Sequence, residues 1–348
     1  MKVGLVGVTG YAGTVLYQLL LQHPEIDEIV LYGHSQVNIH LSAVAPYLAG
    51  ASDPMIHAFS PAEVMQATDC VFFATSAGVT SQVAHEFIAA DFPVIDLSGD
   101  MRLKDPASYE QWYHKAPAAA ADLAAASYGL SDFKPLLTNY VANPGCYATA
   151  TLLGFAPLVQ NQLVDTGSLI VDAKSGLSGA GKKLGTSSHF MNANENVTLY
   201  KPNAHQHIPE IIQQLHAWDP KVTTLQFMTT LIPVDRGIMA AIYAHVDKGL
   251  AEQGAAVVDK VLTQAFQDTY ANDADVHLAG NALPSIKDVA YSNLTALGWV
   301  YNASTGVVTV VSVIDNMLKG AAGQAMQNFN RLFGFSEMTA VPLQPALI

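Results

Sequence analysis

The sequence KVGLVGVTGYAG, residues 2–13, passes from an apolar run into a glycine turn, and apolar residues at helical spacing follow as far as Pro24. This order predicts a strand, a tight turn and a helix. Residues 81–91 form a second predicted helix. Apolar runs predict three further strands, at residues 28–33, 69–76 and 93–100. Because strands and helices alternate, we expect residues 1–145 to form a doubly wound α/β domain around a parallel sheet.

The sequence changes character after Cys146. Residues 255–270 have the pattern of a long amphipathic helix, and residues 316–335 that of a final helix. Strand patterns are grouped with few helices between them, at residues 168–176, 223–234, 239–246 and 308–315. Strands grouped in this way predict an α+β second domain with an antiparallel or mixed sheet.

The overall composition restricts the kind of protein. The chain has 348 residues, of which 50% are hydrophobic and 13% are charged, so two domains with a large core are expected. The net charge of −13 argues against a nucleic-acid surface. No run approaches the ~18 apolar residues of a membrane helix, and the N-terminus has the pattern of a strand rather than of a signal peptide. We therefore expect a cytoplasmic protein with reduced thiols and no membrane partner.

The glycine turn predicts a dinucleotide site. Gly7, Gly10 and Gly13 lie between a strand and a helix, where backbone amides can approach a pyrophosphate. An NAD site usually has a carboxylate at the end of the second strand, but here that strand ends in YGHSQ, residues 32–36. We therefore favour NADP, although no arginine stands there to hold its 2′-phosphate. The alternative is a turn whose glycines serve only the close packing of helix on sheet.

The stretch NPGCYATAT, residues 143–151, indicates a reactive thiol. Cys146 follows a Pro-Gly turn where a helix can begin, and the positive end of a helix lowers the pKa of a thiol. The alternative is a small buried residue at a turn between the domains. Cys70 lies in an apolar strand and is predicted to be a core residue. Two cysteines cannot form a disulfide framework, and their spacing does not suit a metal.

Two histidines in KPNAHQHIPEI, residues 201–211, are candidates to move a proton. His205 and His207 stand in a loop just before Pro209 and Glu210, which begin an amphipathic helix. Alternate residues of an extended loop face opposite ways, so we expect only one histidine to face the thiol. Two histidines without a third ligand make a poor metal site, so we expect no metal and favour acid/base chemistry.

Three further motifs are candidate binding segments. KSGLSGAGK, residues 174–182, offers backbone amides and hydroxyls to a phosphate or to the nicotinamide end of a cofactor, unless it is simply a flexible loop. Arg102 in DLSGDMRL and Arg236 in PVDRGI can each bind a carboxylate or phosphate. Either arginine can equally form a structural ion pair.

These motifs together resemble the N-acetyl-γ-glutamyl-phosphate reductase family, which is related to the aspartate-semialdehyde dehydrogenases. The matching motifs extend from residue 4 to residue 328 in the family's order, as GVTGYAG, DLSGDMRL, YGL, NPGCYAT, KSGLSGAGK, HQHIPEI, LIPVDRGI and IDNMLKGAAGQAMQN. Two positions depart from the family. Gln206 stands where an arginine is usual, and Ser76-Ala77 stands where Pro-His is usual.

The resemblance implies a Rossmann domain that binds NADP, residues 1–145 with 315–348, and a catalytic and oligomerisation domain, residues 146–314. The second domain would be an α+β domain of the semialdehyde dehydrogenase or glyceraldehyde-3-phosphate dehydrogenase-like type. Cys146 would be the nucleophile, and His207, in preference to His205, the acid/base. The residues implied at the cofactor are Gly7, Thr9, Gly10, Tyr11, Ala12, Gly13, Ser35, Ser175, Gly176, Ser178, Gly179 and Asn316. Those implied at the substrate are Arg102, Asn143, Glu210 and Arg236.

The implied reaction is the NADPH-dependent reduction of N-acetylglutamyl 5-phosphate to N-acetylglutamate 5-semialdehyde and phosphate, a step of arginine biosynthesis, through a thioester on Cys146. A homo-oligomer, either a dimer or a tetramer, is expected, without a nucleic-acid partner. Two alternatives remain: an aspartate-semialdehyde dehydrogenase, and a non-catalytic NADP-binding sensor.

Overall fold

The structure is a computed structural model that describes residues 1–48, 50 and 53–346. These residues form two compact units. Unit 1 comprises Met1–Gly145 and Ala321–Pro342, and unit 2 comprises Cys146–Gly320 together with residues 343–346. The C-terminal residues belong to unit 2, where the N–H of Ala346 donates to the carbonyl of Ala290. In the part of the chain that is described, no helix is both long and apolar enough to cross a membrane.

Unit 1 is built on an eight-stranded sheet with the order β3-β4-β2-β1-β5-β6-β8-β7, in which only the β3–β4 pair is antiparallel. Its strands are β1 (Lys2–Val6), β2 (Glu28–Gly33), β3 (Ile39–His40), β4 (Met55–Ala58), β5 (Cys70–Phe73), β6 (Val94–Asp96), β7 (Ser127–Tyr128) and β8 (Tyr140–Ala142). Its helices are α1 (Tyr11–Leu20), α2 (Pro61–Ala67), α3 (Thr80–Ala89), α4 (Pro106–Tyr113), α5 (Ala120–Ala125) and α11 (Gly323–Leu332). The doubly wound α/β prediction is confirmed.

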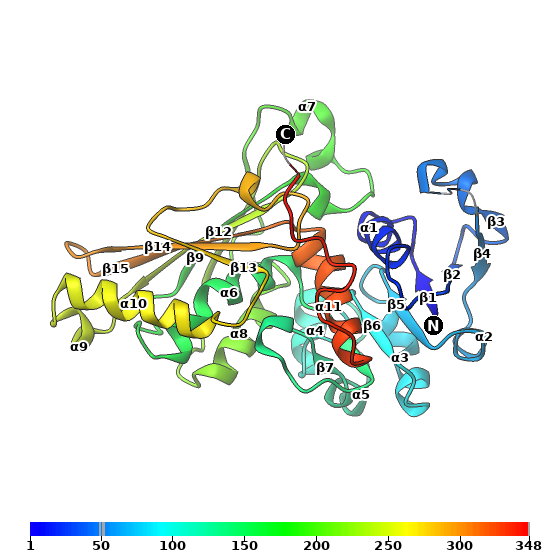
Figure 1. Cartoon of the computed structure of the whole chain (residues 1–348), viewed down its shortest axis with the longest axis horizontal. Helices are drawn as coiled ribbons and strands as arrows, with labels where there is room; N and C mark the ends of the chain where they lie inside the picture. Colours follow the sequence, from blue (N-terminus) through cyan, green and yellow to red (C-terminus); the bar gives the residue numbers. More distant parts are fainter. Residues whose placement is uncertain (49, 51–52, 347–348) are drawn as a thin grey trace. The chain divides into compact units, whose positions relative to one another are not determined.

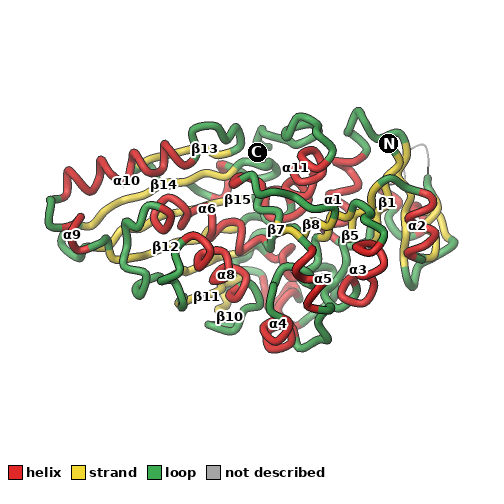
Figure 2. Tube along the Cα trace, turned by 90° about the horizontal axis from the view of Figure 1, so that it is seen from below, coloured by secondary structure: helices red, strands yellow, loops and turns green. Residues whose placement is uncertain are grey.

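Both faces of this sheet are covered by helices. Helices α1 and α11 lie on one side, and α2, α3 and α5 on the other (Figures 1 and 2). The alternation along β5 explains this, because Phe72 packs against Phe329 of α11 with ring centroids 5.4 Å apart, while Phe73 packs against Phe87 of α3 at 5.5 Å. Strands buried on both faces are continuous apolar runs, which is why the sequence identified them.

Unit 2 is built on a seven-stranded mixed sheet with the order β10-β11-β9-β12-β15-β14-β13. Its strands are β9 (Ile170–Ser175), β10 (Thr198–Tyr200), β11 (Gln226–Leu231), β12 (Ile238–His245), β13 (Val276–Gly280), β14 (Thr295–Asn302) and β15 (Val307–Ile314). The β9–β11 and β13–β14 pairs are parallel and the others antiparallel. The helices are α6 (Cys146–Gln160), α7 (Phe190–Ala193), α8 (Ile208–Trp218), α9 (Lys248–Ala251) and α10 (Ala255–Thr269). The α+β prediction with a mixed sheet is confirmed.

Helix α6 is the central helix of unit 2. It lies between α8 and α10 on one face of the sheet (Figure 2). All of its residues from Tyr147 to Val159 are buried. Gly154 allows close packing on the sheet, since a Cβ there would stand 2.4 Å from Ile242 Cδ1 and 3.3 Å from Ser312 Cβ. Cys146 is therefore the first residue of a helix that is held rigidly on all sides.

The last helix differs from its prediction. The pattern at residues 316–335 predicted one continuous helix, but the structure has a π-helical turn at Leu318–Ala322 followed by α11. Asp315 lies at the start of the turn, where its Oδ1 accepts the N–H groups of Met317 (2.8 Å) and Leu318 (3.1 Å). Its carbonyl then accepts the N–H of Gly320, five residues on, at 3.0 Å.

Candidate active site

The glycine turn between β1 and α1 borders a cleft of about 490 Å³ in unit 1. Gly7 has φ +96°, and a Cβ there would lie 2.5 Å from the carbonyl oxygen of Ala74, so only glycine fits. Within the described residues no side chain caps the N-terminus of α1, which begins after Gly10. Its backbone N–H groups are therefore placed to receive an anion such as a pyrophosphate.

The three glycines of this turn have different tasks. A Cβ at Gly13 would stand 2.1 Å from the carbonyl oxygen of Gly7, so Gly13 is needed for the helix to approach the turn. A Cβ at Gly10 would meet nothing closer than 3.6 Å within the protein. Of the three, Gly10 is thus the glycine that no contact within the protein requires; of the three, only Gly7 lines the cleft.

The end of β2 supplies another wall of the cleft. Residues 32–36 line it together with Gly7, Thr9 and Ser76. Among the described residues that line the cleft none is acidic and none is an arginine or lysine. A ribose 2′-hydroxyl therefore has no carboxylate here, while Ser35 offers a hydroxyl and backbone amides. Tyr11, at the start of α1, is exposed, and neither it nor Ala12 lines the cleft.

A carboxylate of the protein occupies the N-terminus of α3. Asp100 accepts the N–H groups of Gly78 (2.7 Å) and Ser81 (3.0 Å) and the hydroxyl of Tyr109 (2.6 Å). The neighbouring Asp96 is fully buried and accepts the N–H of Ser98 at 2.7 Å and the hydroxyl of Tyr140 at 3.0 Å. Burial, followed by the charge of Asp100, raises the pKa of Asp96 to about 6.

Arg102 and Asn143 fix the segment that leads to the thiol. Arg102 is buried and donates through Nε to the carbonyl of Asn143 and through Nη2 to that of Leu97, both at 2.8 Å. The Asn143 side chain donates to the carbonyl of Ala321 at 3.2 Å and accepts from Asn328 at 2.9 Å. Both predicted substrate residues are thus engaged with the protein itself.

Cys146 is the half-buried first residue of α6, whereas Cys70 is fully buried in β5. Burial raises the pKa of Cys70 far above its ordinary value, so its prediction as an inert core residue is confirmed. Two tyrosines lie near Cys146. The hydroxyls of Tyr147 and Tyr200 are 3.0 Å apart, and the pKa of each is raised mainly by burial and, to a lesser extent, by the charge that an ionised Cys146 would carry.

The two histidines lie against these tyrosines. The ring of His205 is 5.1 Å from that of Tyr147 and 4.7 Å from that of His207, centroid to centroid. Both imidazoles are buried, and His205 Nδ1 accepts the backbone N–H of His207 at 3.2 Å. Burial, assisted by the charges of His207 and Lys201, lowers the pKa of His205 to about 2. His205 is therefore neutral at physiological pH, with its proton on Nε2.

His207 and Glu210 belong to the start of α8. His207 is the N-terminal flanking residue of that helix, and Pro209 occupies its first turn. Glu210 follows in the same turn and is fully buried. Because α8 packs beside α6, the sequence HQHIPE brings both histidines to the helix that begins with the thiol.

The first half of the loop KSGLSGAGK is hydrogen-bonded to the rest of unit 2. The N–H groups of Gly176, Leu177 and Ser178 donate to the carbonyls of residues 237, 234 and 235 at 2.9 to 3.0 Å. The Ser175 hydroxyl donates to the carbonyl of Gly176, and that of Ser178 to Asp235. The amides of residues 176–178 are therefore used by the strand connection at 234–237, and the contact of this loop with a phosphate or with the nicotinamide end of a cofactor stays a prediction.

Asn316 and Arg236 complete this assembly. Asn316 is fully buried, accepts the N–H of Gly237 at 2.7 Å and donates to the hydroxyl of Ser178 at 3.0 Å. It thereby ties the loop at Gly179 and its neighbours to the end of β15. Arg236 lies 3.6 Å from Asp315 and stacks over the ring of Tyr291, 4.8 Å from the centroid. Of the two uses predicted for Arg236, the structure forms the ion pair.

Sequence reasoning missed Tyr200 and the carboxylates Asp96 and Asp100 as parts of these sites. Tyr200 stands five residues before His205, and no spacing rule points to it. Asp96 and Asp100 follow the apolar run of β6, where a carboxylate at the end of a parallel strand was a usable signal. In the described part of the chain, no group of three or more His, Cys, Asp or Glu residues is arranged to hold a metal ion.

Two family models match the chain. Residues 2–138 match the model of the semialdehyde dehydrogenase NAD binding domain, and residues 146–316 that of the semialdehyde dehydrogenase dimerisation domain. The chain is 53% identical over 346 residues to N-acetyl-gamma-glutamyl-phosphate reductase 2 of Lactiplantibacillus plantarum, covering 99% of both chains. It is 50% identical over 349 residues to N-acetyl-gamma-glutamyl-phosphate reductase of Limosilactobacillus fermentum, covering 100% of both.

Solved structures share the fold. Aspartate semialdehyde dehydrogenase II of Vibrio cholerae, complexed with ASA, has a TM-score of 0.67 at 16% identity, with 96% of this chain and 98% of that chain covered. Aspartate semialdehyde dehydrogenase of Candida albicans with NADP has a TM-score of 0.67 at 15% identity, with 95% and 98% covered. At these identities the likeness establishes the fold alone.

Proposed function

Because the chain belongs to the N-acetyl-gamma-glutamyl-phosphate reductase family, we propose that it catalyses the NADPH-dependent reduction of N-acetylglutamyl 5-phosphate to N-acetylglutamate 5-semialdehyde and phosphate, in arginine biosynthesis. Full-length relatives at 53% and 50% identity with that name support this substrate over aspartyl phosphate. The observation that carries the proposal is the half-buried Cys146 at the start of the buried helix α6, whose next residue, Tyr147, contacts the rings of His205 and His207.

Cys146 is the nucleophile of this proposal. Its thiolate attacks the acyl carbonyl of the substrate, a carbon–sulfur bond forms, and phosphate leaves with the electrons of the carbon–oxygen bond. The resulting thioester keeps an electrophilic carbonyl, which an oxygen ester would offer less well. A nicotinamide cofactor supplies the hydride that reduces this carbonyl. The thiolate is then expelled and the semialdehyde is released.

His207 is the residue to which we assign the proton. His205, with a pKa of about 2, does not take up a second proton at neutral pH, and its Nδ1 already accepts the N–H of His207. His205 therefore orients its neighbour, while His207 exchanges a proton with the oxygen of the tetrahedral intermediate. Backbone amides at the start of α6 can stabilise the oxyanion, at about 3 kcal/mol for a good donor.

The cleft beside α1 suits the cofactor of this reaction. The uncapped helix N-terminus and the open space at Gly10 suit a pyrophosphate, and Ser35 with its neighbours suits the ribose. The absence of a carboxylate from the described lining supports NADP over NAD. Thr9 lines the same cleft as Gly7. The match of residues 146–316 to a dimerisation domain supports a homo-oligomer.

Replacing Cys146 with Ser tests the proposal. Phosphate-dependent reduction of NADP with N-acetylglutamate semialdehyde should fall by about 10³-fold or more, because the nucleophile is lost. Cys70→Ala, in the core of unit 1, is the matched control and should retain turnover. Aspartate semialdehyde, offered to the wild type, should react far more slowly than the N-acetylated substrate. Wild-type turnover in Cys146→Ser would refute the covalent route.

A further inference from the structure

Lys319 forms a buried ion pair one residue before Gly320, the glycine that contacts Cys146. Lys319 is fully buried in the π-helical turn, and its Nζ is 2.7 Å from Oδ2 of Asp275, which is itself 2% exposed. The same carboxylate oxygen accepts the side-chain N–H of Asn293 at 3.0 Å. Two buried charges are tolerated only when they are paired in good geometry. The position of the lysine, and with it the turn, is therefore tied to the residue that precedes β13.

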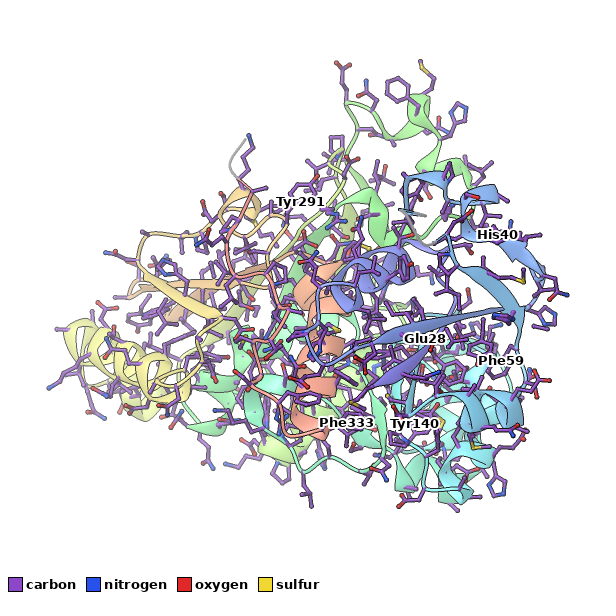
Figure 3. All side chains as sticks on the ribbon, turned by 45° about the vertical axis from the view of Figure 1, so that its right-hand side comes forward. Glu28, His40, Phe59, Tyr140, Tyr291 and Phe333 are labelled. Carbon is purple, nitrogen blue, oxygen red and sulfur yellow. The ribbon has the colours of Figure 1, made fainter. Side chains whose placement is uncertain are left out.

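The turn is also held at its beginning. Besides starting the turn, Asp315 accepts the N–H of Tyr291 at 2.8 Å and lies beside Arg236 (Tyr291 is labelled in Figure 3). The bond from Gly320 N–H to the carbonyl of Asp315 closes it. The turn thus has two anchors, Asp315 at its start and Lys319 near its middle, and each reaches a different segment of unit 2.

Gly320, the next residue, stands directly against the thiol-bearing residue. A Cβ at Gly320 would lie 2.7 Å from Cys146 Cβ and 3.2 Å from Cys146 Cα. These are backbone-proximal atoms at the start of α6, which cannot give way as a flexible side chain can. The turn therefore forms one wall of the space in which the Cys146 side chain is oriented.

We propose that Lys319 is a positioning residue for the thiol, acting through its ion pair with Asp275, which holds Gly320 against Cys146. This rests on the proposed function, in which Cys146 is the nucleophile. When the pair is lost, the turn moves away from α6 and the sulfur is no longer confined where the helix N-terminus favours the thiolate. Both the attack on the substrate and the ionisation of the thiol then suffer.

The test uses the full-length protein with Lys319→Met, which removes the charge at similar volume, and Lys260→Met, at an exposed lysine of α10, as control. We expect kcat to fall about 10-fold or more while KM for the cofactor changes less than about threefold. The pH midpoint of Cys146 alkylation by iodoacetamide, followed on its peptide, should rise by about half a unit or more. Cys70 is fully buried, so its alkylation in the same digest reports unfolding. Tyr147 and Tyr200 are not substituted in either variant. The control should match the wild type in all three readouts.

Two further variants apply if Lys319→Met fails to fold. The double variant Lys319→Met/Asp275→Asn leaves no unpaired charge and should fold, yet show the same losses. Gly320→Ala keeps the ion pair but fills the contact, and should lower kcat similarly. A wild-type kcat and alkylation profile in folded Lys319→Met, or in both of the other variants, would overturn the proposal. The alkylation of Cys146 is measured without turnover, so it tests the positioning role of Lys319 alone. Retained activity in Cys146→Ser would refute the proposed function instead.

Discussion

The carboxyl group of Asp96 makes the stability of unit 1 dependent on pH. The group is fully buried at the end of β6, and its pKa rises from 3.8 to about 6 on folding. Because the folded pKa is the higher one, the group favours the folded state in acid, and this contribution is lost as the pH rises through about 6. At 1.36 kcal/mol for each pH unit, the full loss is about 3 kcal/mol.

The part of this loss that an experiment can follow lies above pH 5. For pKa values of 3.8 and about 6, the linkage relation places about 1.4 kcal/mol of the loss between pH 5 and pH 8. Asp96→Asn removes the titration but can keep the geometry, since the amide oxygen accepts the N–H of Ser98 and the amide nitrogen can donate to Tyr140. From pH 5 to pH 8, the free energy of unfolding of the variant should therefore rise by about 1.4 kcal/mol relative to that of the wild type.

The free energy of unfolding is measured in urea at pH 5, 6, 7 and 8. At each urea concentration, the unfolded fraction is read from a short pulse of thiol labelling at one common pH. Cys70 is suited to this because it is fully buried in β5, the strand that pairs with β6, where Asp96 lies. Glu110→Gln, at an exposed position of α4, is the control and should follow the wild type. If the free energies of unfolding of Asp96→Asn and the wild type change in parallel from pH 5 to pH 8, the titration of Asp96 does not cause the pH dependence and the reasoning fails.

Three further predictions concern the sites. Gly13→Ala should lower the free energy of unfolding by about 1–3 kcal/mol through overpacking, whereas Gly10→Ala should leave urea stability nearly unchanged but weaken NADP binding in a fluorescence titration. His207→Asn should cut turnover about 10²-fold with cofactor affinity intact. A larger loss in His205→Asn, measured in the same assay, would reverse the assignment of the pair. Asn316→Ala should cost about 1–3 kcal/mol in urea unfolding because it leaves a backbone N–H buried without its acceptor; an unchanged midpoint would contradict this.

Periodicity predicted the elements that are buried regularly. The apolar runs gave β1, β2, β5 and β6, and the helical patterns gave α1, α3, α8 and α10, because each of these buries a face at the repeat of its own geometry. Cys146 was placed correctly at a helix start by the Pro-Gly turn before it. Local chemistry was sufficient at these positions.

Contacts between distant segments could not be predicted in this way. The amides of residues 176–178 are used by residues 234–237, and only the folded sheet brings the two together. The π-helical turn depends on a carboxylate at Asp315 and a lysine at Lys319 whose partner is 44 residues away. Tyr200 reaches the hydroxyl of Tyr147 from a short edge strand with no repeat of its own. In each case the deciding partner lies outside any local window of sequence.

The occupied N-terminus of α3 has a consequence for the place at which the phosphates of a dinucleotide lie. Two helices, α1 and α3, begin at the carboxyl edge of the unit 1 sheet beside the same cleft, and each carries a partial positive charge there. At α3 that charge is already neutralised by Asp100. We therefore expect only α1 to attract a doubly phosphorylated linker, which fixes the place of the linker at one of the two helices.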